Sequence, residues 1–350
     1  FPRRSSVIVS NQLRNSNLKT KPFNDLKEQV DLLHRRHLNI KDDEFAKKKL
    51  LETNYFDLIN GFETLLLIDK SDKSLGYENK SFDDFISLYT FDKELNKEIL
   101  AVISSFESKL KTSLAHNFCE IFCEVPEKTL HYLKKNNYED TAKSYGTYHP
   151  AYKDYHYNQF VLFQKPYKRN TNYVEYLKKT KPYVGRYTSP PLWIVIKSFC
   201  MGDLLSMVRL LKRPVLEKVL EDFNLTLNDT NLFINSIEII KDLRNTCAHF
   251  ELVNRFRTSG VYPIDKSLIT KLQLNVLSNR HRGTKNNYRI RLFDALKVLT
   301  LFEDVTPIRK VVVRYYDRNV TIRKKYLILP LLDRMGEPNI NNWKILGYQG

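Results

Sequence analysis

The apolar residues of this chain recur at helical spacing over most of its length. One amphipathic stretch begins after Asn24 and predicts a helix there, and a second extends from near Asp42 toward Asn54. Residues 65 to 82 hold several turn formers and predict a loop with a short element.

The longest apolar stripe lies between Phe91 and Phe122 and predicts a long helix. Its apolar positions follow a period near 3.6 and are Leu95, Ile99, Val102, Phe106, Leu110, Leu114 and Ile121. Glu107 and Lys111 form an i, i+4 pair of opposite charge that flanks this stripe.

Two further helices follow in the middle of the chain. The Pro-Pro pair at 190–191 predicts the start of a helix at Leu192. The side chains expected to run inward from it are Trp193, Ile196, Phe199 and Leu204, with Gly202 as a kink or a point of close approach. The next helix, N-capped by Asp229 or Thr230, is expected to continue to about Val253.

The C-terminal part has a mixed pattern. A helix is predicted by Leu292, Leu296, Leu299 and Phe302. Residues 308 to 330 contain VVVRYY and YLILP, whose β-branched and aromatic residues predict strands. Because glycine is scarce, at 10 residues, and long amphipathic stretches dominate, the expected fold class is all-α, with helical N-terminal and short-stranded C-terminal additions.

The length of the chain limits the number of domains, and its charge indicates the kind of binding partner. A chain of 350 residues suffices for about two domains. The regions we expect are a basic flexible arm (1–24), an N-terminal helical region (25–90), a helical core (91–260) and a basic C-terminal region (261–350). The formal net charge of +17 favours a polyanionic partner, either nucleic acid or an acidic membrane surface. A solvated basic surface without a partner is the alternative.

Residues 132 to 187 form an insertion of unusual composition. They contain twelve of the 21 tyrosines and eleven Lys or Arg against four acids. The tyrosines form either a packing layer covered by lysine stems or a stacking surface for single-stranded or looped RNA. The basic residues expected to contact RNA are Lys134, Lys135, Lys168 and Arg169 here, and Arg280, Arg282, Lys285, Arg289 and Arg291 in a second acid-free stretch.

The cysteines give little support for metal binding. The four of them form no CxxC pair, and no paired Cys/His clusters stand at zinc-finger spacing. His116, Cys119 and Cys123 lie close together without an evident fourth ligand, so a helix with buried thiols is expected. We expect no metal and no cofactor. No apolar run is long enough to span a bilayer and no signal peptide is evident, so a soluble cytoplasmic protein without membrane contact is expected.

The sequence RNTCAHF, residues 244 to 250, places an arginine and a histidine near the end of the apolar helix after Asp229. Arg244 follows Phe233, Ile237 and Ile240 on an apolar stripe, where a charge is costly unless it is paired or faces a cleft or a subunit. His249 falls on a polar stripe with Glu238, Asp242 and Asn245, and Asn245 can orient its ring. The alternative without function is an arginine paired with an acid such as Glu107 and a surface histidine.

RNTCAHF resembles the RNxxxH signature of the HEPN superfamily and the RNxCAH block of bacterial abortive-infection Abi-like proteins of the AbiD/AbiF group. Further blocks resemble that family in the same order. They are KPFNDLKEQVDLLHRRHLNI (21–40), NYFDLINGF (54–62), FDKELNKEILAVISSFESKLKTSLAHNF (91–118), PPLWIVIKSFCMGDLLSM (190–207) and DRMGEPNINNW (333–343). The resemblance thus spans nearly the whole chain.

The resemblance implies an all-α HEPN-type helical bundle and a role in defence against phage. HEPN ribonucleases cut RNA without a metal, and many form dimers in which two Arg/His motifs face each other. By position, Arg244 and His249 would be catalytic, with Asn245, Glu107 and Asn254 in support. A small structured non-coding RNA is an implied partner, and a homodimer through the core is an implied assembly.

The chain departs from the family after the motif. The family often reads RNxCAHHxRxxN, whereas Phe250 replaces the second histidine here and only Asn254 remains recognisable. The family's YYRL block is altered to YFDL. Two functions therefore compete: a metal-independent HEPN endoribonuclease, and a non-cleaving module that binds a non-coding RNA. A membrane-active or purely structural effector of cell death is disfavoured, since no long basic amphipathic helix is present.

Overall fold

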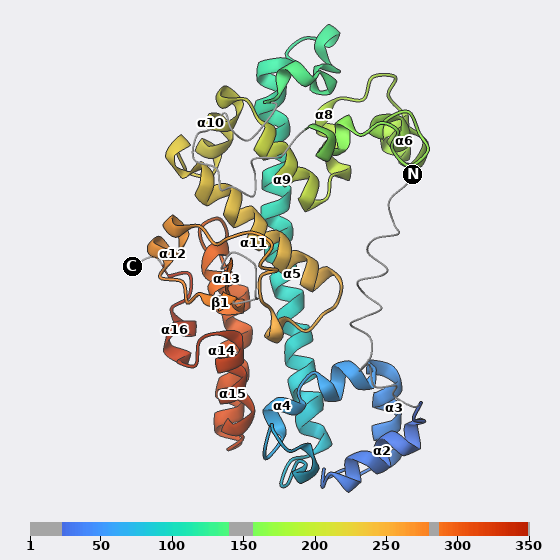
Figure 1. Cartoon of the computed structure of the whole chain (residues 1–350), viewed down its shortest axis with the longest axis vertical. Coiled ribbons are helices and arrows are strands. Elements are labelled where there is room, and N and C mark those ends of the chain that lie inside the picture. The colour runs from blue at the N-terminus through green and yellow to red at the C-terminus, as the bar shows by residue number, and fades with distance from the viewer. Residues whose placement is uncertain (1–22, 140–156, 280–286, 349–350) are drawn as a thin grey trace, which may run out of the picture. The chain divides into compact units, whose positions relative to one another are not determined.

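The computed structural model describes residues 23–139, 157–279 and 287–348 (Figure 1). Within these ranges the chain is mainly helical with almost no strand, which confirms the all-α fold class. The chain divides into two compact units, one up to Ser87 and one from Leu88 onward. The boundary falls within the long helix α5 (Phe82–Phe122).

The described residues of the first unit form five helical elements before α5. They are α2 (Leu26–Arg35), α3 (Asp43–Thr53), a π-helical turn (Phe56–Asn60) and α4 (Glu63–Leu66), followed by the 3-10 turn Lys73–Leu75. Asp25 and Glu28 form a reciprocal capping box at the start of α2, and Asp42 caps α3. Both predicted N-terminal helices are thereby confirmed.

The second unit holds the remaining elements. Its helices after α5 are α6 (Tyr173–Thr180), α7 (Pro182–Gly185), α8 (Leu192–Val195), α9 (Met201–Leu210), α10 (Arg213–Asp222), α11 (Thr230–Ala248), α12 (Lys266–Leu272), α13 (Leu292–Leu299), α14 (Thr306–Thr321), α15 (Lys325–Met335) and α16 (Ile340–Lys344). Short 3-10 turns lie at Pro126–Lys128, His131–Leu133, Lys135–Asn137, Tyr157–Gln159, Val161–Phe163, Ile196–Ser198, Leu227–Asp229 and Val253–Arg255. Strands β1 (Leu277–Asn279) and β2 (Asn287–Arg289) form an antiparallel pair in which Ser278 lies opposite Tyr288.

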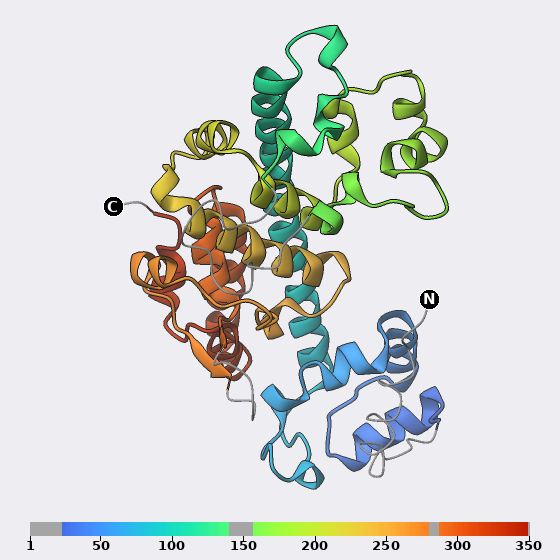
Figure 2. The same cartoon turned by 45° about the horizontal axis from the view of Figure 1, so that its top comes forward.

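The core of the second unit forms where α11 packs against α9 and α13, as Figures 1 and 2 show. Aromatic rings join α5 to this core. Phe106 of α5 contacts Phe223 and Phe302, and Phe233 of α11 contacts the same two rings, with centroid separations from 5.1 to 6.0 Å. Such edge-on and tilted ring pairs are favourable beyond the area they bury. Phe91 of α5 also stacks on Tyr315 of α14 at 4.3 Å.

The strands predicted between residues 308 and 330 are absent, because this segment forms α14 and α15. Its buried residues in α14 include Ile308, Val311, Val312 and Tyr315, which recur at three- and four-residue spacing. That period places them on one helical face, whereas strand pairing would send neighbours to opposite faces. Tertiary burial on a helical face therefore outweighs the β propensity of the VVVRYY run.

The prediction for Trp193 is also wrong. The helix predicted at Leu192 is a single turn that gives way to the 3-10 turn Ile196–Ser198. Leu192, Val195 and Ile196 are buried, while Trp193 projects outward with 55% of its surface exposed. Gly202 introduces no kink, since it lies in the first turn of α9, and a Cβ added there would meet only the Cys200 sulfur, at 3.6 Å.

Phe233→Ala should lower the free energy of unfolding by about 3–5 kcal/mol, because it empties the centre of the ring cluster. Urea denaturation followed by circular dichroism measures this loss. Phe250→Ala is a matched control, since its ring is 71% exposed, and should change stability by less than about 0.5 kcal/mol. Equal losses in the two variants would contradict the assigned core.

Candidate functional site

Helix α11 brings the motif RNTCAHF to the edge of the core. Phe233, Ile237 and Ile240, which precede Arg244 on its stripe, are fully buried. Arg244 continues that stripe, yet 32% of its side chain is exposed. The guanidinium therefore lies where the core meets solvent, so that its charge remains partly hydrated.

Arg244 is paired with Glu107. This is the pairing expected from the sequence as the alternative to a functional role. The Nε atom of Arg244 lies 3.8 Å from Oε2 of Glu107, which is an ion pair too long for a hydrogen bond. The other carboxylate oxygen of Glu107 accepts a hydrogen bond of 2.7 Å from Lys111, which confirms the predicted i, i+4 pair. Among the described residues, no acceptor hydrogen-bonds the guanidinium, so its donors can reach a phosphate.

The helix ends at Ala248, five residues before the end predicted at about Val253. Phe250 adopts a left-handed conformation with φ of 57°. The N–H of Phe250 donates to the Cys247 carbonyl and that of Glu251 to the Thr246 carbonyl, both at 3.1 Å. This pair of bonds terminates helices, usually with glycine in the left-handed position. The apolar pattern did not reveal the stop because phenylalanine occupies that position.

His249 stands at the last position of this helix end and is exposed. Its backbone N–H donates to the Asn245 carbonyl at 3.0 Å. Asn245 is also exposed, and within residues 23–139, 157–279 and 287–348 no side chain hydrogen-bonds the His249 ring. The imidazole is therefore open to solvent, and the link from Asn245 is through its backbone rather than its amide.

A buried carboxylate holds the turn that follows His249. Asp92 of α5 is completely buried and accepts three hydrogen bonds: from the Val253 N–H at 3.1 Å, the Asn254 N–H at 2.8 Å and the Asn254 side-chain amide at 2.7 Å. Burial raises the pKa of the Asp92 carboxyl, and these three donors oppose that rise. Asp92 thereby fixes the backbone just beyond the motif.

Asn254 connects this turn to the C-terminal helices. Its side-chain oxygen accepts a hydrogen bond of 3.2 Å from Arg334 of α15. Asn254 is fully buried, and burial lowers the pKa of Arg334 to about 10. Asn254 therefore supports the motif by packing and hydrogen bonding, without access to a substrate.

Sequence reasoning missed both Asp92 and Arg334. Each lies in a block that resembles the Abi-like family, 91–118 for Asp92 and 333–343 for Arg334. The signal available in the sequence was that these two blocks and Asn254 all belong to the same family pattern, which suggests that they lie close together in the fold. Hydropathy could not have supplied it, because both side chains are charged and would be assigned to the surface.

The thiol inside the motif is not a nucleophile. Cys247 is fully buried, and burial raises its pKa to about 12. At neutral pH it therefore stays protonated, whereas the thiolate is the reactive form.

The basic residues proposed for RNA contact fall into three groups. Lys134, Lys135, Lys168 and Arg169 are exposed. Arg289 and Arg291 are half-buried and donate to the carbonyls of Ser259 and Asp333, both at 2.9 Å, so they hold local backbone. Arg280, Arg282 and Lys285 lie outside the described residues.

Several tyrosines of the 132–187 insertion form a packing layer. Tyr132, Tyr138 and Tyr173 are buried. Their hydroxyls donate to the carbonyls of Pro190, Tyr132 and Ser198, respectively, at 2.8 to 3.1 Å. For these residues the packing interpretation accounts for the tyrosine content.

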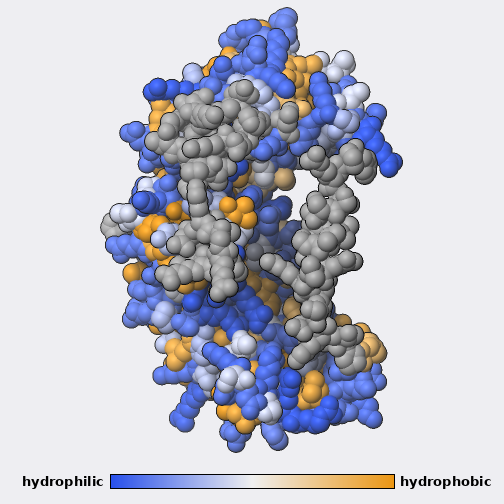
Figure 3. Space-filling model, viewed as in Figure 1, coloured by the Kyte–Doolittle hydropathy of each residue, from blue (hydrophilic) through white to orange (hydrophobic). Residues whose placement is uncertain are grey.

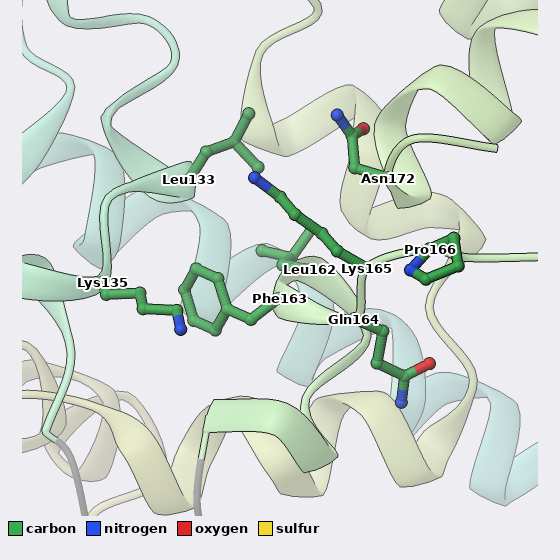
Figure 4. Close-up of a pocket in the computed structure, with 8 residues that line it drawn as sticks. All are labelled: Leu133, Lys135, Leu162, Phe163, Gln164, Lys165, Pro166 and Asn172. Carbon is green, nitrogen blue, oxygen red and sulfur yellow. The ribbon is translucent and has the colours of Figure 1, made fainter.

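The same insertion contains a cavity of about 780 Å³ with a mixed lining. Figure 4 shows the amine of Lys165 reaching toward Leu133, and Asn172, the residue before α6, also lines the cavity. Lys135 extends beside the ring of Phe163, 5.9 Å from its centroid. On the face in Figure 3, the visible surface of the described residues is mainly hydrophilic, with apolar groups scattered among polar ones.

The described residues contain neither a metal-binding cluster nor a membrane-spanning helix. No group of three His, Cys, Asp or Glu side chains in this part of the chain could hold a metal ion. No helix there combines the length and apolar character that crossing a bilayer requires.

Asn254→Ala should lower the free energy of unfolding by about 2–4 kcal/mol, because Asp92 and Arg334 each lose a buried hydrogen bond. His249→Ala should change it by less than about 0.5 kcal/mol, since the ring is exposed. Urea denaturation of both variants distinguishes a supporting residue from a solvent-facing one. An unchanged midpoint for Asn254→Ala would contradict the supporting role.

Comparison with known proteins gives a match over the region that contains this site. A family model described as Abi-like protein matches residues 48–253, which include α5 and the motif at 244–250. No curated protein and no solved structure matches the chain. Since the matched region covers more than half of the 350 residues, the chain belongs to the family of Abi-like proteins.

Proposed function

We propose that this protein is an abortive-infection effector that binds RNA and cleaves it at Arg244 and His249 by the HEPN mechanism. The family suggests a role in abortive infection, a form of defence against phage. The observation that carries the cleavage proposal is the end of α11. There a helix that is mostly buried up to Ile240 presents a guanidinium without a hydrogen-bonded acceptor among the described residues, and an exposed imidazole.

These two groups suffice for cleavage next to a ribose. The 2′-OH attacks the adjacent phosphorus, the bond to the 5′ oxygen breaks, and the products carry a 2′,3′-cyclic phosphate and a 5′-OH. Histidine titrates near neutral pH, so His249 can take the proton from the 2′-OH or give one to the leaving oxygen. Arg244 can hold the phosphate with two donors and offset charge on its oxygens.

A homodimer supplies the partner that one motif lacks. A single imidazole cannot act as base and acid in the same step, and one chain carries one such motif. Two copies related by a two-fold axis would present two histidines and two arginines to one phosphate. Arg244, at the solvent edge of an apolar stripe, is suited to lie at such an interface.

The positive charge of the protein would attract RNA. The chain has a formal net charge of +17, and the exposed cations Lys134, Lys135, Lys168 and Arg169 belong to the same unit as the motif. Contacts of this kind release counterions, so affinity should fall steeply as salt rises.

A non-cleaving RNA-binding module is the second candidate, and Phe250 favours it. Phe250 replaces the second histidine that the family often carries, and its exposed ring can neither transfer a proton nor bind phosphate. In that case Arg244 and His249 would grip a small structured non-coding RNA in a stable ribonucleoprotein.

His249→Ala and Arg244→Ala should each slow cleavage of RNA by roughly 10²–10⁴-fold, because each removes proton transfer or phosphate stabilisation. Incubation with labelled single-stranded RNA and analysis of fragment ends measures this, together with plating of phage on cells that carry each variant. His37→Ala, another exposed histidine, and Arg314→Ala are the matched controls.

Both controls should keep wild-type cleavage and phage protection. A His249→Ala protein that still cleaves RNA and protects cells would refute the catalytic assignment. Loss of protection in His249→Ala with no cleavage by the wild type would favour the binding module.

A further inference from the structure

A groove in the second unit has no role in the chemistry described above. One face of α5, from Ser108 to Glu120, forms one wall together with Cys123 and Glu124 just after the helix, and Trp193, Ile196 and Lys197 form the other. Its volume is about 1120 Å³. We call it the α5 groove.

Trp193 gives the α5 groove an accessible aromatic surface. The chain has two tryptophans; Trp343 is fully buried, while Trp193 is 55% exposed. Its neighbours Leu192 and Val195 fill the core, so the indole is left on the outside of a single helical turn. Exposed aromatic rings of this kind stack on the bases of single-stranded nucleic acids.

The charges of the α5 groove favour an anion near Trp193. Glu120 is paired with Lys218 at 3.0 Å, and Glu124 with Lys128 at 2.6 Å. Both carboxylates are thus neutralised. Lys197 has no carboxylate partner among the described residues; its amine lies 5.5 Å from the centroid of the Tyr183 ring.

One end of the α5 groove is connected to Arg244 through Glu107 and Lys111 of α5. Lys111 lines it and hydrogen-bonds Glu107, the residue paired with Arg244. From Lys111 to Glu120 the helix rises by roughly 14 Å. A strand whose phosphate lies at Arg244 could therefore continue along this wall.

We propose that the α5 groove binds the single-stranded RNA that continues from the scissile phosphate, with a base stacked on Trp193 and a phosphate held by Lys197. This inference rests on the proposed function, since it places the cut at Arg244 and His249. Trp193 would make the groove selective for single-stranded RNA. Unpaired bases can stack on its indole, whereas the bases of a duplex are already stacked and paired.

The test measures binding of a fluorescein-labelled single-stranded oligouridylate in the His249→Ala background, which prevents cleavage. Trp193→Ala should weaken binding by roughly ten-fold, while Trp193→Phe retains most of the affinity. Lys197→Ala should reduce the slope of log affinity against log salt by about 0.7, and Trp193→Ala should leave that slope unchanged. Phe56→Ala, an exposed aromatic outside the groove, is the matched control.

Intrinsic fluorescence supplies a second readout. Since Trp343 is buried, quenching by the oligouridylate should come from Trp193 and vanish in Trp193→Phe. A blunt duplex of equal length should quench little. Binding with no quenching, or equal affinity for wild type and Trp193→Ala, would overturn the groove assignment and leave cleavage at His249 standing.

Failure of the proposed function has a different signature. It would appear as cleavage that survives His249→Ala, whatever the groove variants do. Quenching that rises with protein concentration in the absence of RNA would assign the groove to a second copy of the chain and overturn this inference.

Discussion

The buried carboxylate of Asp92 is the constraint on which the candidate site depends. It belongs to α5, it is completely buried, and it accepts three hydrogen bonds from the turn that follows α11. Without it, two backbone N–H groups and one amide would be buried with no acceptor, at a cost of about 1–3 kcal/mol each. This link holds the turn that follows the motif against α5.

The helix end adds a second constraint. Phe250 occupies a left-handed position that suits glycine, and its carbonyl accepts a hydrogen bond of 2.8 Å from Lys93 of α5. The position where the family often has a second histidine is thus a structural turn here, with its side chain directed to solvent. This arrangement leaves one imidazole per chain at the motif, which is why the proposed chemistry requires two copies.

Much of the fold follows from periodicity, and the failures have physical causes. The capped helices near Asp25 and Asp42 and the stripe of α5 were predictable because local sequence and tertiary burial agree there. The strands predicted after residue 308 were wrong because β-branched residues also fit one buried face of a helix. At the candidate site, the sequence was enough to predict Arg244, Glu107 and His249. The hydrogen bonds between Asp92 and Asn254 join residues far apart in the chain, so only the folded structure shows them. The exposure of Trp193 could not be predicted either, because a single turn of helix leaves no period to follow.

The described residues thus combine a candidate cleavage motif with a groove along α5, and Glu107 and Lys111 connect the two. The most direct measurement of the central claim is to purify the protein from cells and sequence the RNA that accompanies it, with the chemistry of each RNA end determined. The proposal predicts heterogeneous fragments that end in 2′,3′-cyclic phosphate, and their disappearance in His249→Ala. One intact, uniform small RNA, bound equally by wild type and His249→Ala, would contradict it.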